Sequence, residues 1–314
     1  MTEGELATDV YAAIDCGTHS TRVLIKRGEQ TVVRTVELTR LGERLKPKGA
    51  LQPAALDRVY GALERYRILL DEHKVPAERI MIAATSAARD ASNGADFLQQ
   101  ASAIVGSEAT VLDGETEGAM TFLGATAELD AADGPFLVID IGGGSTEFAF
   151  GTTECEAAIS LDIGSVRLSE MYLENDPPLP EELSNCVTYT GAWLDDVDRE
   201  MPQAHTAKTV VGVAGTIATA VAVEIGLPEY DRDQIHHFVL SREAVEDVFR
   251  TLATENREDR SHNPGLPPGR VDTIVGGMSI LAKVMRHFDL DDLLASESDI
   301  LDGLAARARG GAVS

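Results

Sequence analysis

Residues 14–21 read Ile-Asp-Cys-Gly-Thr-His-Ser-Thr, and residues 139–146 read Ile-Asp-Ile-Gly-Gly-Gly-Ser-Thr. The two segments share Ile, Asp, Gly, Ser and Thr at the same offsets, and each lies between two apolar runs. Each pattern is typical of a strand, a tight glycine turn and a second strand, with a carboxylate near the end of the first strand. The repetition predicts a duplicated fold with one such turn in each half.

A glycine turn of this kind presents backbone N–H groups and hydroxyls, which bind anions such as phosphate. The carboxylates of Asp15 and Asp140 would repel that anion, which indicates a cation between them and the anion. Either turn alone is more typical of an ordinary hairpin, but the repeat favours two turns that hold a phosphate chain in a cleft. The candidate phosphate-binding residues are Gly17, Thr18, His19 and Ser20 in the first turn, and Gly142, Gly143, Gly144, Ser145 and Thr146 in the second.

The composition is that of an ordinary globular protein, with 44% apolar and 25% charged residues among 314. The net charge of −25 argues against nonspecific binding to nucleic acid and against binding to anionic membranes. Residues 22–48 contain eight basic and three acidic residues, which beside an anion-binding turn favours a short cationic pocket over a merely solvated surface. The first residues are acidic and lack an apolar leader, and no run is long and apolar enough to span a membrane. We therefore expect a cytoplasmic protein.

Strand and helix patterns alternate along both halves of the chain, which predicts an α/β architecture. A polar segment with Gly and Pro, residues 128–135, marks the expected boundary, so domains are expected at 1–127 and 128–314. Each half is expected to open with three strands. Three of the later helices are expected to begin at Ala119, Ile217 and Arg270.

Eight motifs occur in the order seen in one known family: residues 15–20, 85–89, 114–117, 140–147, 164–168, 215–219, 270–277 and 296–303. On these motifs the chain resembles the Ppx/GppA exopolyphosphatases of the actin/sugar-kinase/Hsp70 superfamily, and most closely the short two-domain actinobacterial members. The resemblance implies two ribonuclease-H-like (actin-like ATPase) domains with a phosphate-binding cleft between them. It also implies that a C-terminal helix at about 298–310 packs back on the first domain, and that the protein is a homodimer.

The resemblance further implies catalytic roles. Glu117 matches the family's catalytic glutamate in a Gly-x-x-Glu pattern, and would accept a proton from the attacking water. Glu115 is the second choice, and a mere interaction of Glu117 with a helix dipole is the structural alternative. Arg89 resembles an arginine of the family that contacts phosphate. Further candidate phosphate-binding residues are Arg22, Arg270, Gly215 and Thr216, whereas Arg167 is equally consistent with a structural role.

Asp140 and Glu147 are the expected Mg²⁺ ligands, with Asp15 contributing directly or through water. Mg²⁺ prefers hard oxygen ligands and usually keeps several waters and substrate oxygens. His19 departs from the family, which usually has Asn at this position. An amide both donates and accepts, whereas neutral imidazole has one donor and one acceptor nitrogen, so metal coordination, activity or pH dependence is expected to differ. His236 and His237 are expected to serve packing or the surface.

Four functions fit these patterns. The leading prediction is an exopolyphosphatase that releases terminal phosphate from inorganic polyphosphate, with short chains preferred. The second is a guanosine pentaphosphate (pppGpp) 5′-phosphohydrolase with the same chemistry. A kinase of the same superfamily is disfavoured by Glu117 and by the small second half. A noncatalytic polyphosphate or nucleotide sensor is suggested only by His19.

Overall fold

The computed structural model describes residues 9–45 and 49–310. The chain divides into two compact units, one of residues up to Gly124 together with those from Ile300, the other of residues Ala125–Asp299. Lys46 and Lys48, which belong to the basic segment noted in the sequence, lie outside the described residues. Within the described part of the chain, no helix combines the length and apolarity that a membrane crossing requires.

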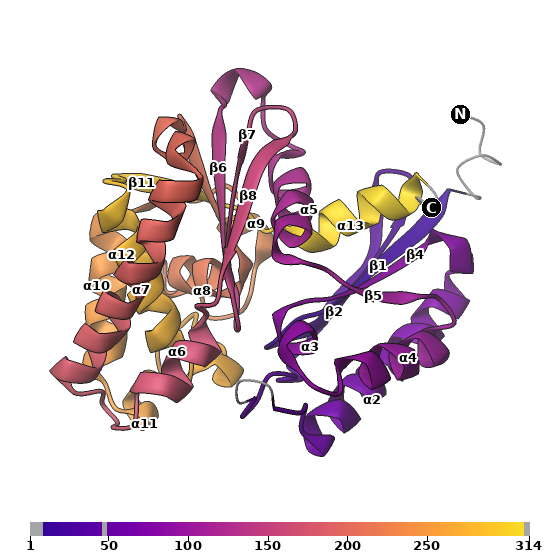
Figure 1. Cartoon of the computed structure of the whole chain (residues 1–314), viewed down its shortest axis with the longest axis horizontal. Helices are drawn as coiled ribbons and strands as arrows, with labels where there is room; N and C mark the ends of the chain where they lie inside the picture. Colours follow the sequence, from indigo (N-terminus) through magenta and orange to yellow (C-terminus); the bar gives the residue numbers. More distant parts are fainter. Residues whose placement is uncertain (1–8, 46–48, 311–314) are drawn as a thin grey trace. The chain divides into compact units, whose positions relative to one another are not determined.

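Unit 1 contains a five-stranded sheet in the order β3-β2-β1-β4-β5 (Figure 1). Its strands are β1 (Val10–Cys16), β2 (Thr21–Arg27), β3 (Gln30–Glu37), β4 (Ile80–Ala84) and β5 (Ala109–Val111). Its helices are α2 (Pro53–Glu72), η1 (Ala77–Arg79), α3 (Ser86–Asp90), α4 (Gly94–Val105), α5 (Gly114–Thr126) and α13 (Ile300–Arg309). The strands β1, β2 and β3 are antiparallel, whereas β4 and β5 continue the sheet in parallel with β1.

The alternation along β1 places one apolar cluster on each face of this sheet. Ala12 and Ile14 belong to the cluster that contains the buried residues of α2 and α4, whereas Tyr11 and Ala13 pack with residues of α13. A strand directs successive side chains to opposite faces, so a fully buried strand such as β1 requires cover on both. The face that contains Tyr11 and Ala13 is covered by α13, which lies almost 300 residues further along the chain.

Unit 2 contains a six-stranded sheet in the order β10-β11-β9-β6-β7-β8 (Figure 1). Its strands are β6 (Phe136–Ile141), β7 (Thr146–Gly151), β8 (Cys155–Leu161), β9 (Thr209–Val213), β10 (Val239–Ser241) and β11 (Asp292–Ala295). Its helices are η2 (Ala131–Asp133), α6 (Ser165–Tyr172), α7 (Pro180–Glu200), η3 (Pro202–Thr206), α8 (Ala214–Glu224), α9 (Arg232–Ile235), α10 (Arg242–Thr254), α11 (Arg257–Arg260), η4 (Pro268–Arg270) and α12 (Ile274–His287). The apolar core of the unit joins β6 to α7, α8, α10 and α12.

The two sheets repeat one topology. Strands β3, β2, β1, β4 and β5 correspond in order and direction to β8, β7, β6, β9 and β11. The duplication and the α/β architecture predicted from the repeated turn are confirmed by this correspondence. Because β1, β4 and β5 are parallel, their carboxyl ends share one edge of the sheet, and the same holds for β6, β9 and β11. That edge is where open α/β sheets bind ligands.

A single glycine allows α13 to approach α5 closely. A Cβ atom built on Gly303 would lie 2.0 Å from the carbonyl oxygen of Met120, a backbone atom that cannot move aside without shifting α5. We therefore expect Gly303→Ala to lower the free energy of unfolding by about 1–3 kcal/mol, although alanine favours helix more than glycine does. Urea unfolding curves measure the change.

Gly61 in α2 is the matched control, because a Cβ there would come no closer than 3.4 Å to any atom, and that atom is the flexible end of Arg65. Gly61→Ala is expected to raise the free energy of unfolding by about 0.5–1 kcal/mol through helix propensity alone. Equal effects of both substitutions would contradict the packing assigned to Gly303.

Candidate active site

The two glycine turns close in the same way. The N–H of Gly17 donates to the carbonyl of Ser20 at 2.9 Å, and the N–H of Gly142 donates to the carbonyl of Ser145 at 3.1 Å. A Cβ on either glycine would lie 3.1 Å from the carbonyl oxygen that its own N–H contacts. The two segments therefore share their local geometry as well as their sequence. A side chain at either glycine would crowd the carbonyl oxygen of the hydrogen bond that closes the turn.

In the first turn, the carbonyl groups are held by the segment that follows β3. The carbonyl of Thr18 accepts from the N–H of Gly42, and the carbonyl of His19 accepts from the N–H of Arg40, both at 2.9 Å. The C=O and N–H of a trans peptide point in opposite directions. The N–H groups of His19 and Ser20 are therefore directed away from this backing segment.

In the second turn, the first turn of α6 supplies the backing. The carbonyls of Gly142 and Gly143 accept from the N–H groups of Ser165 and Val166, each at 2.9 Å. By the same reasoning the N–H groups of Gly143 and Gly144 point away from α6. Neither donates a hydrogen bond to any other described residue. Two adjacent N–H groups directed to the same side are a suitable site for an anion.

Arg167 also contributes to this backing. Its Nε atom donates to the carbonyl of Gly144 at 2.8 Å, and its Nη2 atom lies 3.7 Å from Oδ1 of Asp162. The sequence is consistent with two roles for Arg167, and these contacts favour the structural role. The guanidinium stabilises the turn from the side on which α6 lies.

The carboxylates beside the two turns have different partners. Asp15 lies opposite Arg22 in the β1–β2 ladder, and its Oδ2 atom accepts from Nε and Nη2 of Arg22 at 3.0 and 2.7 Å. The equivalent position opposite Asp140 is Glu147. Unit 1 thus pairs its carboxylate with an arginine, whereas unit 2 places two carboxylates opposite each other.

This carboxylate pair in unit 2 is suited to a divalent cation. Directly opposed residues of antiparallel strands lie on the same face, and like charges there are destabilising unless a cation compensates them. The side chains are also buried, with 7% of Asp140 and 2% of Glu147 exposed. Oε1 of Glu147 accepts from the hydroxyl of Ser160 at 2.6 Å, which fixes the carboxylate. The donor set fits Mg²⁺, which prefers carboxylate oxygens.

In unit 1, the structure brings Arg89 and Glu117 together. Nη1 of Arg89 donates to Oε2 of Glu117 at 3.1 Å and to the carbonyl of Leu112 at 3.1 Å. Arg89 lies on α3, which follows β4, and Glu117 lies on α5, which follows β5. Both helices begin at the same sheet edge where β1 leads into the first glycine turn. Glu117 is 7% exposed, so the ion pair orients a nearly buried carboxylate.

Helix α5 begins at Gly114, five residues before the expected start at Ala119. The reason is a side-chain cap: Oδ1 of Asp113 accepts from the N–H of Thr116 at 2.8 Å, which satisfies an N–H of the first helical turn. This hydrogen bond lowers the pKa of Asp113. Glu117 is consequently a first-turn helix residue rather than part of a strand-to-helix loop.

Helix α8 begins at Ala214, before the expected start at Ile217, and its first residues adjoin Arg270. A Cβ on Gly215 would lie 1.6 Å from Nη2 of Arg270, so the guanidinium rests directly on the glycine. Ala214 has a φ of 69°, which is unusual for a residue with a side chain and costs free energy. Such strain at a helix start occurs at ligand sites more often than elsewhere. Arg270 itself ends η4, and α12 begins only at Ile274, which corrects the expected helix start.

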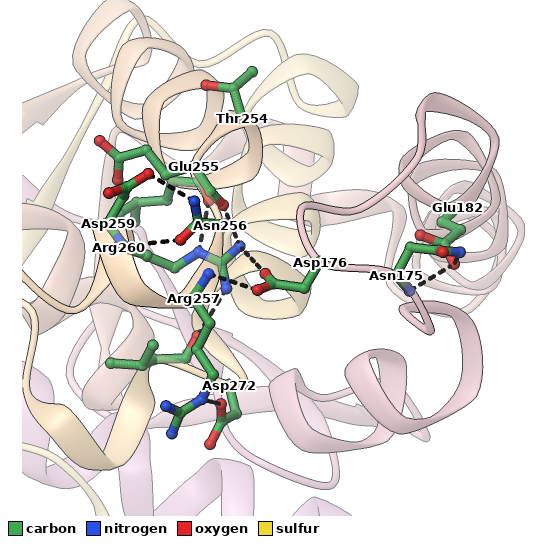
Figure 2. Close-up of polar contacts among 12 residues, drawn as sticks. Asn175, Asp176, Glu182, Thr254, Glu255, Asn256, Arg257, Asp259, Arg260 and Asp272 are labelled. Atoms are coloured by element: carbon green, nitrogen blue, oxygen red, sulfur yellow. Dashed lines mark hydrogen bonds and ion pairs between the residues drawn. The ribbon is translucent and has the colours of Figure 1, made fainter.

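The segment after Arg270 is anchored by two arginines of α11 (Figure 2). Arg260, with only 4% of its surface exposed, donates from Nη1 to the carbonyl of Val271 at 3.2 Å. Arg257 donates from Nε to Oδ1 of Asp272 at 2.6 Å. Asp176 joins both arginines, because it accepts from Nη2 of Arg260 and from the N–H of Arg257.

Comparison with known proteins identifies the family. Residues 23–307 match the model of the Ppx/GppA phosphatase family. The chain belongs to this family. Exopolyphosphatase 2 of Mycobacterium tuberculosis is 38% identical to it over 97% of this chain and 100% of the relative. The crystal structure of an exopolyphosphatase-like protein superposes with a TM-score of 0.90 at 34% identity, over 95% of this chain and 98% of that one.

A more distant relative has a different substrate in its name. The guanosine-5′-triphosphate,3′-diphosphate pyrophosphatase of Aeromonas salmonicida is 25% identical over 94% of this chain and 58% of that protein. The predicted resemblance to the Ppx/GppA family is thus confirmed, and with it the α/β fold class with two units of repeated sheet topology. As a Ppx/GppA protein, the chain is a phosphoanhydride hydrolase.

The predicted site residues of this Ppx/GppA chain fall into two groups, one in each unit. Unit 1 contains the first turn, Arg22, Arg89 and Glu117, whereas unit 2 contains the second turn, the carboxylate pair, Thr216 and Arg270. Part of the basic segment has a structural role, since Arg34 is paired with Asp302 of α13. His236 and His237 stack with a centroid separation of 3.8 Å, and the N–H of Glu297 donates to Nδ1 of His236.

Sequence reasoning missed Arg257, Arg260 and the backing of the turns by α6. The run Arg257-Glu258-Asp259-Arg260 consists of four charged residues and is typical of a solvated helix surface. Only Arg260 is buried, and its burial depends on contacts with Asp176 and Val271, which lie far from it in the sequence or in an irregular loop. No local pattern contains that information.

Proposed function

We propose that the chain is an exopolyphosphatase that hydrolyses the terminal phosphate of inorganic polyphosphate, with short chains preferred. The ion pair between Arg89 and Glu117 at the carboxyl edge of β1, β4 and β5 carries the proposal for the chemistry. The likeness to exopolyphosphatase 2 along its whole length supports the choice of substrate. A preference for short chains is expected from the acidic protein as a whole, because a net charge of −25 disfavours a long anionic polymer.

In this mechanism Glu117 is the general base. Its carboxylate accepts a proton from water, whose oxygen forms a bond to the terminal phosphorus as the bond to the bridging oxygen breaks. Arg89 holds Oε2 of Glu117 in place and, through its remaining donors, contacts the terminal phosphate. The leaving group is the polyphosphate shortened by one unit. The N–H groups of the two glycine turns bind non-bridging phosphate oxygens.

Asp140 and Glu147 would hold Mg²⁺, and Asp15 is proposed as a further ligand, direct or through water. When bound, Mg²⁺ neutralises charge on the phosphate oxygens. Within unit 1, Arg22 already compensates the charge of Asp15. We therefore assign the primary ligation to the carboxylate pair of unit 2.

The second candidate is pppGpp hydrolysis, which is favoured by the likeness to the Aeromonas salmonicida pyrophosphatase. The two substrates share the terminal phosphoanhydride and differ at the far end of the molecule, where pppGpp carries a nucleoside and polyphosphate carries further phosphates. Phosphate release should be measured in parallel from short polyphosphate, long polyphosphate and pppGpp, with excess Mg²⁺. A higher kcat/KM for short polyphosphate is expected. Turnover of pppGpp alone would reverse the choice, and binding without turnover of any substrate would favour a sensor.

The proposal includes a homodimer, on the basis of the family resemblance alone, and a cytoplasmic location, on the basis of the composition of the sequence. Sedimentation velocity of the purified chain gives the mass of the assembly directly. A monomer across the accessible concentration range would remove the homodimer from the proposal without affecting the assigned chemistry.

Gly215→Ala is expected to lower kcat/KM about 100-fold with little loss of stability. The added methyl group would displace the guanidinium of Arg270, whose flexible side chain moves at small cost, and a misplaced phosphate contact costs about this factor. Steady-state kinetics and thermal unfolding measure the two effects. In an Arg270→Ala background, Gly215→Ala should add almost nothing, because the group that it displaces is gone. Additive losses would show that Gly215 acts independently of Arg270.

A further inference from the structure

A cluster of carboxylates and imidazoles lies where α7 and α12 end. Asp195 and Asp198 come from the last two turns of α7, and His287 is the last residue of α12. One carboxylate oxygen of each aspartate and one ring nitrogen of His287 all lie within 4.8 Å of one another. His205, from η3, adds a second imidazole beside Asp198.

The distances in the cluster are close to those of a metal ligand shell. Nε2 of His287 lies 3.1 and 3.0 Å from Oδ1 and Oδ2 of Asp198, and Nε2 of His205 lies 2.8 Å from Oδ1. Ligands bound tetrahedrally at about 2.0–2.1 Å from Zn²⁺ are separated by roughly 3.3 Å. Asp198 and His287 are therefore already close to ligand spacing, whereas the carboxylate of Asp195, which lies within 4.8 Å of both, would move inward to complete the set.

The rings are held in place by packing. The side chain of His287 is 13% exposed, and its ring meets that of Phe288 edge to face with 5.1 Å between centroids. The ring of His205 lies 4.9 Å from the same phenylalanine. The ring of His287 is therefore fixed with a nitrogen toward Asp198, which reduces the entropy that a ligand shell would lose on binding. The ring of His205, which is 43% exposed, is oriented chiefly by its hydrogen bond to Asp198.

The electrostatic environment also favours a cation. Two helices end at the cluster, and the carboxyl end of a helix carries partial negative charge. Burial alone would raise the pKa of Asp198, but the hydrogen bonds from His205 and His287 outweigh it and lower the pKa.

The two basic residues next to the cluster have contacts with other residues. Arg199 is bonded to Asp196 and also lies 3.7 Å from Glu200. Lys283 lies one helical turn before His287 and packs against Gly191. Asp195 has no hydrogen bond or ion pair with any described residue.

We propose that Asp195, Asp198 and His287 bind a divalent transition-metal ion, for which Zn²⁺ is the best match, and that His205 orients Asp198. Imidazole suits zinc and its neighbours in the series, whereas Mg²⁺ selects all-oxygen ligands. The site shares no residue with the carboxylate pair of Asp140 and Glu147. Its ion would join the ends of α7 and α12, so the expected role is stabilisation of unit 2.

The test uses the full chain stripped of metal by a chelator and titrated with Zn²⁺ in a calorimeter, at neutral pH and with Mg²⁺ in large excess. One Zn²⁺ site that persists in Mg²⁺ is expected. Asp195→Asn and His287→Ala should each weaken it by at least roughly 10-fold to 100-fold. Asp196→Asn is the matched control, because this aspartate lies on the same helix and is bonded to Arg199. Its Zn²⁺ affinity should equal that of the wild type.

Thermal unfolding provides a second readout that does not depend on activity. Zn²⁺ should raise the unfolding midpoint of the wild type and of Asp196→Asn, but not of Asp195→Asn. The Asp195 variant is informative because this side chain forms no hydrogen bond or ion pair among the residues described, so the fold should persist. The proposal is overturned if the wild type binds no Zn²⁺, or if Asp195→Asn and His287→Ala bind it unchanged. It is also overturned if His237→Ala alone abolishes binding, which would place the ion at the stacked histidine pair.

Discussion

Replacing Glu117 by glutamine is expected to lower kcat for polyphosphate about 100-fold to 10,000-fold, the usual contribution of a general base. The amide retains the size of the side chain and an oxygen that can accept from Arg89, so the site should keep its shape. Substrate binding should change little, because the lost interaction forms chiefly in the transition state. Single-turnover kinetics with a separate binding measurement distinguish the two effects.

Glu115 provides the matched control for this experiment. It lies in the same first turn of α5 but is exposed, whereas Glu117 is buried against Arg89. Glu115→Gln should therefore retain the wild-type rate. If Glu115→Gln is inactive while Glu117→Gln is not, the base is Glu115. If both variants are active, the proton acceptor lies outside α5, and the assignment of this helix to catalysis is wrong.

The second large effect is expected at the opposed carboxylates. Asp140→Asn removes one of two charges that face each other across β6 and β7, and should raise the Mg²⁺ concentration for half-maximal activity roughly 10-fold to 100-fold. At saturating Mg²⁺, part of the activity should return. Thermal unfolding of the variant checks that the loss of Mg²⁺ affinity does not come from a loss of folding.

Glu156→Gln is the control for the metal experiment, since this carboxylate lies exposed on the neighbouring strand β8. Its Mg²⁺ titration should superpose on that of the wild type. A normal titration of Asp140→Asn would contradict its assignment as a ligand and leave Glu147 and Asp15 as the remaining candidates. Loss of activity that no Mg²⁺ concentration restores, with folding intact, would mean that Asp140 acts on the substrate itself.

The first hairpin of each half could be predicted from the sequence because the same motif occurs in both halves, so each copy supports the interpretation of the other. The strands that end at Cys16 and Ile141 and the turns after them are indicated by continuous apolar runs followed by glycine, which are local signals. The predicted starts of α5 and α8 were wrong. Asp113 is an ordinary N-cap residue, but Gly114 and Gly118 favour a loop over a helix there, and a strained Ala214 has no sequence signal. The short strands β10 and β11 were not predicted, because three or four residues carry too little periodicity.

The candidate site shows the same contrast between features that local sequence predicts and features that depend on the folded chain. Residue types and spacing predicted which side chains are candidates, and the structure adds which of them contact each other within a unit. That Arg22 pairs with Asp15, and that Arg260 anchors the segment after Arg270, depends on strand register and on loop packing. Those are properties of the folded chain, and they have no counterpart in any short stretch of sequence.

The discontinuous make-up of unit 1 has a consequence for biosynthesis. The face of its sheet that contains Tyr11 and Ala13 is covered by α13, which is synthesised after the whole of unit 2. At about 5–20 residues per second, translation of the intervening unit takes on the order of ten seconds or more. During that interval the nascent sheet exposes an apolar surface that a chaperone can bind. Unit 2 is contiguous and complete before α13 is made, so it is expected to reach its native state first.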